Sequence, residues 1–333
     1  MRPDLVPSVS IIQDGRPTLE HALSVLSKEL GFTPDSSDPV GRMVYLPGKT
    51  WRRRIFGTVR GKPVSLRIDT HKLPIEEETM RDKFRAQLGV GKLFPVRPPE
   101  TFDWQPFDDK KGYGWSLDEV GGEQPLFLPD TDPGQAAVAF LTMYHELRSA
   151  IQKPFWHPDI ASASELSRLQ AATWRTKSQE LVPGFGEKHA DLLNRLEHAF
   201  VSRQQDQSTR FTHAHLAGTD IRLKDKHYLV FANHFWSWRQ PGYDIAFAIW
   251  WQWMSLPSER RSAEEVRGIT ERWLGHIQAE RPNYLNGVHA MLLNRCFGSL
   301  LLDIPLKRER ESPSAIQALE EAIVAEAERL LAI

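Results

Sequence analysis

The sequence of 333 residues predicts an α+β fold with two lobes, a small lobe built on an antiparallel sheet and a larger, mainly helical lobe. Two observations predict this order. Short segments of alternating apolar and polar residues, separated by turn residues, fill the first third of the chain. From about residue 133, apolar residues instead recur at the three- and four-residue spacing of amphipathic helices. A chain of this length can bury a sizeable hydrophobic core.

The N-terminal part, residues 1–38, is expected to be a helical extension. An amphipathic helix is predicted over residues 18–30, where Thr18 can act as the N-cap. Its apolar face consists of Leu19, Ala22, Leu23, Leu26 and Leu30. The turn-rich segment TPDSSDPVG, residues 33–41, follows this helix and predicts a linker.

Residues 39–127 form the predicted sheet lobe. Strands are expected at residues 43–46, 54–59, 64–68, 96–102 and 113–120. The second and third of these strands flank the turn Arg60-Gly61-Lys62-Pro63, which predicts an antiparallel hairpin. Residues 75–88 predict a helix, because acidic residues lie in its first turn, where the helix dipole stabilises negative charge.

Residues 128–333 form the predicted helical lobe. Helices are expected at residues 133–150, 163–180, 187–204, 243–254, 262–279, 284–301 and 312–332. The longest apolar stretch, Ile245 to Met254, is about half of the ~20 residues that a membrane-spanning helix needs. It therefore predicts a buried helix, and its tryptophans are expected to lie in the core: Trp250, Trp251 and Trp253.

The composition limits the classes of partner and the cellular compartment. A formal net charge of -1 gives no reason to expect nucleic acid or an anionic membrane as a partner. The single cysteine, Cys296, excludes an intrachain disulfide, and its apolar neighbours predict a buried thiol. Residues 1–13 contain no basic segment followed by an apolar run, so no secretory signal is expected. These features together predict a cytoplasmic protein.

Residues 210–250 contain the pattern that indicates a function. A histidine-containing turn precedes two short strand-like segments, residues 221–223 and 228–231, and a loop then leads into an apolar helix. This order resembles the aminoglycoside phosphotransferase and choline kinase superfamily. Members of that superfamily carry His-Gly-Asp, then Asn before a strand pair, and Tyr-Asp-Leu-Ala at a helix start. The resemblance implies a two-lobed, protein-kinase-like fold.

The alignment of this segment needs no gaps. His213 stands at the family histidine, Ala214 at the glycine and His215 at the catalytic aspartate. Asp220 stands at the metal-binding asparagine. The run Tyr243-Asp244-Ile245-Ala246 matches the start of the family helix.

The resemblance extends upstream into the predicted sheet lobe. The segment DEVGGEQPL, residues 118–126, is similar to the family strand and hinge, which implies a nucleotide-binding role for Glu119 and Val120. Arg67, within the strand-like run VSLRI, stands where the family holds phosphates with a lysine or arginine. The resemblance implies that Glu78, in the helix predicted over residues 75–88, is the partner of this cation.

The acidic residues of the family site are mostly replaced. Phosphoryl transfer needs a residue that orients the attacking hydroxyl and Mg²⁺ that bridges the phosphates, and Mg²⁺ prefers carboxylate oxygens. The base position carries His215, and the first metal position carries Asp220. The second metal position carries Ala232, or Asn233 if the alignment slips by one residue, and the glycine-rich loop retains only Gly48. These changes together predict a degenerate active site.

Two functions are compatible with this site. The first is a catalytically degenerate phosphotransferase that acts like a pseudokinase, by binding a nucleotide without metal, a small molecule or a protein partner. The alternative is an active, ATP-dependent phosphotransferase that modifies an alcohol group of a small molecule. In the alternative, His215 would be the base, Arg67 would bind the phosphates, and Asp220 with Asn233 would bind Mg²⁺.

Structural roles are also expected for residues of this segment. Asp244 is expected to accept hydrogen bonds from the loop backbone, and His213 to pack within the same loop. Trp236 and Trp238 are expected to fill the substrate cleft or to form an aromatic surface for a ligand. A looser zinc site is a further alternative, with the ligands His213, His215, Asp220 and His234.

Overall fold

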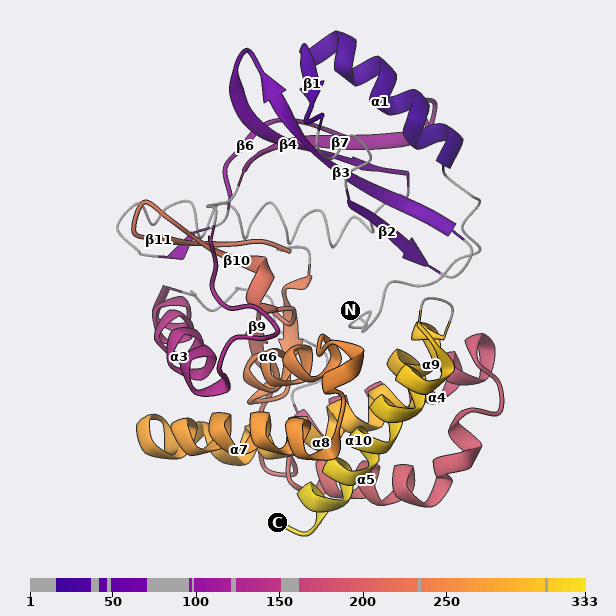
Figure 1. Cartoon of the computed structure of the whole chain (residues 1–333), viewed down its shortest axis with the longest axis vertical. Helices are drawn as coiled ribbons and strands as arrows, with labels where there is room; N and C mark the ends of the chain where they lie inside the picture. Colours follow the sequence, from indigo (N-terminus) through magenta and orange to yellow (C-terminus); the bar gives the residue numbers. More distant parts are fainter. Residues whose placement is uncertain are drawn as a thin grey trace. The chain divides into compact units, whose positions relative to one another are not determined.

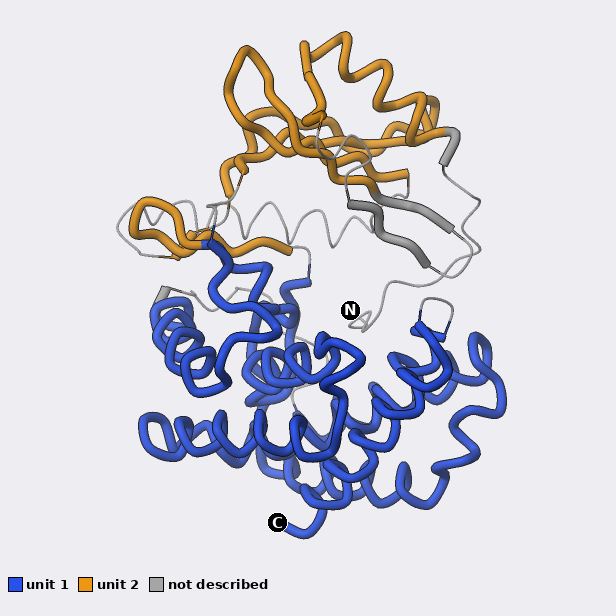
Figure 2. Tube along the Cα trace, in the orientation of Figure 1, with its two compact units in different colours: residues 1–5, 124–222, 235–333 blue, residues 6–123, 223–234 orange. Residues whose placement is uncertain are grey.

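The structure is a computed structural model that describes residues 16–36, 42–46, 49–70, 96–97, 99–120, 124–150, 162–232, 235–308 and 311–333. The chain forms two compact units, coloured separately in Figure 2. The sheet unit comprises residues 6–123 and 223–234, and the helical unit comprises residues 1–5, 124–222 and 235–333. The helix predicted over residues 75–88, with Glu78, lies outside the described residues.

A six-stranded antiparallel sheet forms the sheet unit (Figure 1). Its strands follow the path β1-β3-β4-β7-β6, and β2 pairs with β3. The bounds are Phe32–Pro34 for β1, Arg42–Leu46 for β2, Lys49–Val59 for β3, Lys62–Asp69 for β4, Thr101–Asp108 for β6 and Tyr113–Glu119 for β7. The predicted hairpin is confirmed, since β3 and β4 pair with Val59 opposite Lys62.

Two details of the sheet unit differ from the sequence-based expectation. The strand expected at residues 96–102 is two strands, β5 (Val96–Arg97) and β6, and Pro99 between them has no backbone N–H to donate to a ladder. The start of the expected linker is a strand, because β1 pairs antiparallel with β3. The pair of short strands expected after the histidine turn is confirmed as β10 (Ile221–Lys224) and β11 (His227–Val230).

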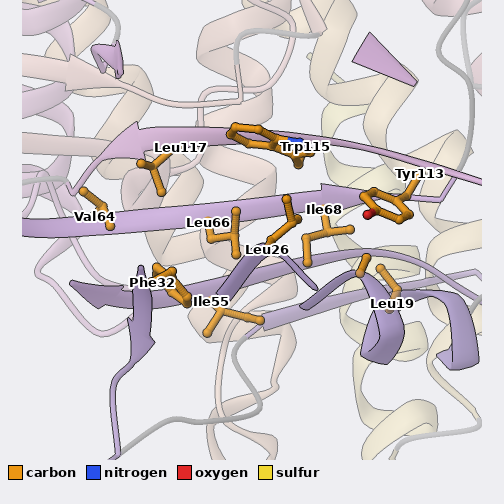
Figure 3. Close-up of a cluster of buried hydrophobic side chains, with 11 residues drawn as sticks. Leu19, Leu26, Phe32, Ile55, Val64, Leu66, Ile68, Tyr113, Trp115 and Leu117 are labelled. Carbon is orange, nitrogen blue, oxygen red and sulfur yellow. The ribbon is translucent and has the colours of Figure 1, made fainter. Parts of the chain in front are cut away.

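Helix α1 (Arg16–Leu30) covers one face of this sheet and completes its core. Figure 3 shows Leu19 and Leu26 of α1 against Leu66 and Ile68 of β4. Each of these side chains is at most 1% exposed, and burying one contributes about 1.5–3 kcal/mol. The helix expected as an N-terminal extension therefore supplies part of the core of the sheet unit.

The helical unit contains the helices that the sequence predicts from residue 133 onwards and one short helix, α9, that it does not predict (Figure 1). Their bounds are Pro133–Ala150 for α3, Ala163–Leu181 for α4, Ala190–Ser202 for α5, Tyr243–Met254 for α6, Ala263–Glu280 for α7, Leu285–Gly298 for α8, Ile304–Lys307 for α9 and Pro313–Leu331 for α10. Helix α8 packs against both α5 and α6. The predicted helix over residues 284–301 continues beyond α8 as a π-helical turn, Ser299–Asp303.

The apolar helix predicted over residues 243–254 is α6, and most of it is buried. Trp253 is fully buried, whereas Trp250 and Trp251 are partly exposed. The indole N–H of Trp250 donates to the Ser299 hydroxyl over 2.7 Å. Of the helices in the described part of the chain, none combines the length and apolar character needed to cross a membrane.

Candidate functional site

The histidine turn follows a two-stranded ribbon in the helical unit. Strand β9 (Arg210–Thr212) pairs antiparallel with β12 (Ser237–Arg239), and Trp238 lies opposite Phe211. The ring of Trp236, which is 1% exposed, stacks on Phe211 at 5.7 Å and meets the edge of His213 at 5.0 Å. Trp236 and Phe211 therefore form an apolar support for the turn, and His213 packs within it as expected.

Asp244, the second residue of α6, fixes the backbone of the turn. Its Oδ1 atom accepts a hydrogen bond from the Ala214 amide over 2.7 Å, which confirms the role predicted for this carboxylate. Ala214 has a φ of 63°, the left-handed region that a glycine would adopt without strain. Burial raises the pKa of Asp244 to about 6, although the hydrogen bond from Ala214 acts in the opposite direction.

His215 and Asp220, the residues expected as base and first metal ligand, contact each other. The Nδ1 atom of His215 lies 2.9 Å from Oδ2 of Asp220. The imidazole stacks on Phe235, with ring centres 4.2 Å apart, and also contacts Phe247 of α6 at 4.7 Å. These contacts fix the ring, yet 33% of the His215 side chain and 26% of the Asp220 side chain stay exposed. A carboxylate on Nδ1 favours the tautomer that leaves Nε2 free to accept a proton.

Mg²⁺ that is bound together with a nucleotide usually takes one or two protein carboxylates, and Asp220 is the carboxylate that stands at a predicted metal position. Within the described ranges, no three His, Cys, Asp or Glu side chains are grouped closely enough to hold a metal ion. Ala232 has no ligand atom in its side chain, and Asn233 and His234 lie outside the described residues. The proposed zinc ligands His213 and His215 have different neighbours, because His213 packs on Trp236 while His215 pairs with Asp220.

Arg67 lies on a buried, polar face of the sheet unit. The side chains of β4 alternate, so Arg67 and Asp69 share the face opposite Leu66 and Ile68. The Nε atom of Arg67 lies 3.0 Å from Oδ2 of Asp69, and Arg67 is only 6% exposed. Arg54 of β3 is its cross-strand neighbour. The phosphate-binding role of Arg67 stays a prediction, and so does that of Glu78, which is not described.

Glu119, at the end of β7, is held by two cations of the sheet unit. Its carboxylate accepts hydrogen bonds from Arg97 over 2.7 and 3.0 Å and from Lys224 over 2.6 Å. Burial opposes ionisation of this carboxyl, but the hydrogen bonds outweigh it and lower the pKa of Glu119 to about 2. Lys224 also donates to the Val120 carbonyl over 3.3 Å. Part of the hydrogen-bonding capacity expected for a nucleotide is thus already used within the protein.

Two buried arginines close to His215 were missed by the sequence analysis. Arg239 and Arg295 are each 6% exposed, and both guanidinium groups lie over the ring of Tyr243. Arg295 also lies over Phe247, which touches His215. Among the described residues, Nε and Nη1 of Arg239 and Nε and Nη2 of Arg295 have no hydrogen-bond acceptor. Burial and the charge of Arg295 lower the pKa of Arg239.

One sequence signal could have pointed to this cluster. Tyr243, Phe247 and Trp250 recur at four- and three-residue spacing and therefore share one face of α6. Arg295 lies over all three rings. The arginine itself gives no such signal, because its partner face belongs to a helix about 50 residues earlier in the sequence.

Comparison with known proteins supports the fold. No protein-family profile matches the sequence, and no curated protein is significantly similar to it. A thermostable mutant of the aminoglycoside phosphotransferase APH(4)-Ia in its apo form is 13% identical, with a TM-score of 0.60. That alignment covers 93% of this chain and 98% of the other.

Two further solved structures are similar over most of their length. An aminoglycoside phosphotransferase from Alicyclobacillus acidocaldarius is 13% identical, with a TM-score of 0.53, covering 88% of this chain and 91% of that one. A choline/ethanolamine kinase family protein from Mesorhizobium loti is 13% identical, with a TM-score of 0.51, covering 95% of each chain. This chain therefore has the protein-kinase-like fold of aminoglycoside phosphotransferase and choline kinase structures, as its motif order predicted.

Proposed function

We propose that this protein is a catalytically degenerate member of the kinase-like fold, which binds a ligand or partner and does not transfer phosphate from Mg-ATP. The observation that carries this proposal is the bond between His215 and Asp220. Phosphoryl transfer relies on carboxylates that hold Mg²⁺ and position the acceptor. Here the carboxylate of Asp220 is bound to the residue that replaces the base, and Ala232 stands at the second metal position.

The sheet unit supports the same proposal. Arg67 is paired with Asp69, and the Val120 carbonyl accepts a hydrogen bond from Lys224. A nucleotide would therefore compete with contacts that the protein already makes. A variant of APH(4)-Ia has been solved as a ternary complex with ADP and hygromycin B. The same fold thus holds a nucleotide and a small molecule in that protein. The ligands to test here are therefore a nucleotide held without metal and a small molecule in the acceptor site.

Differential scanning fluorimetry of the full chain with ATP and ADP, with and without Mg²⁺, tests this proposal. A ligand that binds only the folded state raises the melting temperature. We expect Mg²⁺ to leave any nucleotide-induced rise unchanged, in the wild type and in Asp220→Asn alike. A rise that requires Mg²⁺ and disappears in Asp220→Asn would show a working metal site and would contradict the proposal.

An active phosphotransferase is the second candidate, and one observation favours it. The Asp220 carboxylate accepts a hydrogen bond from Nδ1 of His215 and thereby orients the imidazole. Nε2 of His215 is then able to accept the proton of an alcohol. In this case ATP turnover with an alcohol acceptor would depend on His215. Replacing it with Asn would lower the rate about 10²–10⁴-fold, the usual contribution of a general base. Equal turnover by the wild type and His215→Asn would exclude this candidate.

A further inference from the structure

The helical unit contains a polar cavity whose role the proposed function does not explain. Its volume is about 240 Å³, and it is lined by α3, by β9 and by the first turns of α6 and α8. A water molecule occupies ~30 Å³ of liquid, so the cavity has room for a compact molecule. It is smaller than the ~300–1,000 Å³ of sites for drug-sized ligands. The lining does not include His215 or Asp220.

The charged groups of the cavity are all cationic. Arg148 of α3 and Arg210 of β9 line it, and no Asp or Glu side chain does. Neither arginine forms an ion pair with a described carboxylate, although the charge of Arg148 partly offsets the burial that raises the pKa of Asp244. Guanidinium groups bind phosphate and carboxylate oxygens through paired N–H donors. The charge of this lining therefore selects an anion.

Neutral donors surround the two guanidinium groups. Tyr144 and Tyr284 line the cavity together with amide side chains, those of Gln207, Asn283 and Asn286. Burial raises the pKa of the Tyr144 hydroxyl, so this group remains a proton donor at every physiological pH. Hydroxyl and amide groups can satisfy the remaining oxygens of a phosphate or carboxylate, or the polar groups that such a molecule carries.

The backbone adds two helix N-termini to the same wall. Gly242 is the N-cap of α6, with a φ of 82°, and a Cβ atom there would lie 2.3 Å from the carbonyl carbon of Gly287 in α8. A Cβ atom at Gly287 would lie 2.8 Å from the Pro241 carbonyl oxygen. Only two glycines allow this approach, which brings the first turns of α6 and α8 together at the cavity. Helix N-termini carry partial positive charge and unpaired amides, and both features favour an anion.

The cavity wall is also the strand that leads into the histidine turn. Arg148 donates from Nη1 to the Phe211 carbonyl over 2.7 Å. Thr212, the next residue of β9, lines the cavity, and the amide of Ala214, two residues further on, donates to Oδ1 of Asp244. A ligand bound to Arg148 would therefore act on the strand that leads directly into the histidine turn.

We propose that this cavity is a second binding site, which takes a small molecule through a phosphate or carboxylate group and thereby changes the position of the histidine turn. The proposal is independent of whether the turn is catalytically active. Its support is a cavity lined by two helix N-termini and two arginines and by no carboxylate, in which Arg210 belongs to the strand before His213 and Arg148 donates to that strand.

Titration calorimetry of the full chain with inorganic phosphate, and separately with malonate, at constant ionic strength tests the site. We expect saturable binding of at least one of them, which identifies the preferred oxyanion. Arg210→Gln removes an exposed guanidinium, so it should leave folding intact and weaken binding at least about tenfold. Arg168→Gln removes an equally exposed guanidinium from α4, outside the cavity, and should bind as the wild type does.

Several outcomes would overturn the proposal. One is the absence of saturable binding of either anion, and another is equal weakening by Arg210→Gln and Arg168→Gln. Asp220→Asn separates this proposal from the proposed function, because it removes the carboxylate at His215 and should leave anion binding unchanged. The imidazole signals of His215 in NMR spectra should shift as the anion saturates the site, and in Arg148→Gln they should not. Unchanged His215 signals in the saturated wild type would contradict the coupling.

Discussion

The Nδ1 atom of His215 lies 2.9 Å from Oδ2 of Asp220, so the residue expected as the base is hydrogen-bonded to the residue expected as the first metal ligand. The resemblance implies different roles for these two positions, one toward the acceptor and one toward the metal. Here they form a single hydrogen-bonded pair whose ring is fixed by Phe235 and Phe247. The arrangement is that of an oriented imidazole.

The tautomer of His215 follows from this pair. A carboxylate only accepts hydrogen bonds, so neutral His215 must carry its proton on Nδ1. In ¹⁵N NMR spectra of the wild type we expect the His215 signals of an Nδ1–H tautomer. Asp220→Ala should release the ring and mix the tautomers, whereas Asp220→Asn keeps an oxygen acceptor and should largely restore the wild-type signals. Identical spectra of wild type and Asp220→Ala would show that the pair does not form.

Asp244 should make the stability of the helical unit depend on pH. Its pKa is raised from about 4 in the unfolded chain to about 6, so its stabilising contribution is complete below pH 4 and is lost as the pH rises through 6. In Asp244→Asn the amide oxygen can still accept the Ala214 N–H. We expect the unfolding free energy of Asp244→Asn, relative to the wild type, to rise by about 3 kcal/mol between pH 4 and pH 7. Urea denaturation across this range measures the difference, and a constant difference would contradict the assigned pKa.

The left-handed conformation of Ala214 should cost stability. Ala214 and Ala217 are buried in the same turn, but Ala214 has a φ of 63° and Ala217 a φ of -76°. Replacing either residue by glycine removes one buried methyl group and raises the conformational entropy of the unfolded chain by the same amount. Only Ala214→Gly also relieves backbone strain. We expect Ala214→Gly to be more stable than Ala217→Gly by about 1–2 kcal/mol in chemical denaturation. Equal stability of the two variants would contradict a strained turn.

Arg239 should lower the stability of the fold. Its Nε and Nη1 atoms have no acceptor among the described residues, and the charge of Arg295 repels it. A buried charge without a hydrogen-bonded partner costs free energy, so replacing it by an apolar side chain of similar length is expected to stabilise the fold. We expect Arg239→Met to raise the melting temperature, and the exposed control Arg168→Met to leave it nearly unchanged. A fall of several degrees in Arg239→Met would mean that the guanidinium is stabilised by a contact not seen here.

The sequence predicted the elements whose periodicity is strong. The helices from residue 133 onwards, the hairpin of β3 and β4, and the hydrogen bond from the turn to Asp244 all follow from local pattern or motif order. The motif order was informative because Asp244 and the turn are 30 residues apart in the sequence and yet form one contact in this fold.

Contacts that depend on distant parts of the chain could not be read from the sequence. The apolar face of α1 is visible in its sequence, but its packing against residues of β3, β4 and β7 is a contact between distant parts of the chain, which local pattern does not show. The hydrogen bonds from Arg97 and Lys224 to Glu119 join strands that are far apart in the sequence. Likewise, the sequence did not predict the hydrogen bond between His215 and Asp220, because the resemblance implies a separate role for each residue.

The most direct test of the proposed loss of metal chemistry is the affinity for ATP, measured by titration calorimetry with and without Mg²⁺, in the wild type and in Ala232→Asp. Ala232 has a φ of 58°, a conformation that aspartate adopts more readily than alanine, so the substitution suits the backbone. It also places a carboxylate at the position that the ungapped alignment predicts for the second metal ligand, for which Asn233 is the alternative. We expect Mg²⁺ to leave the affinity of the wild type unchanged and to raise that of Ala232→Asp. Tighter binding of Mg-ATP than of ATP by the wild type would contradict a degenerate site.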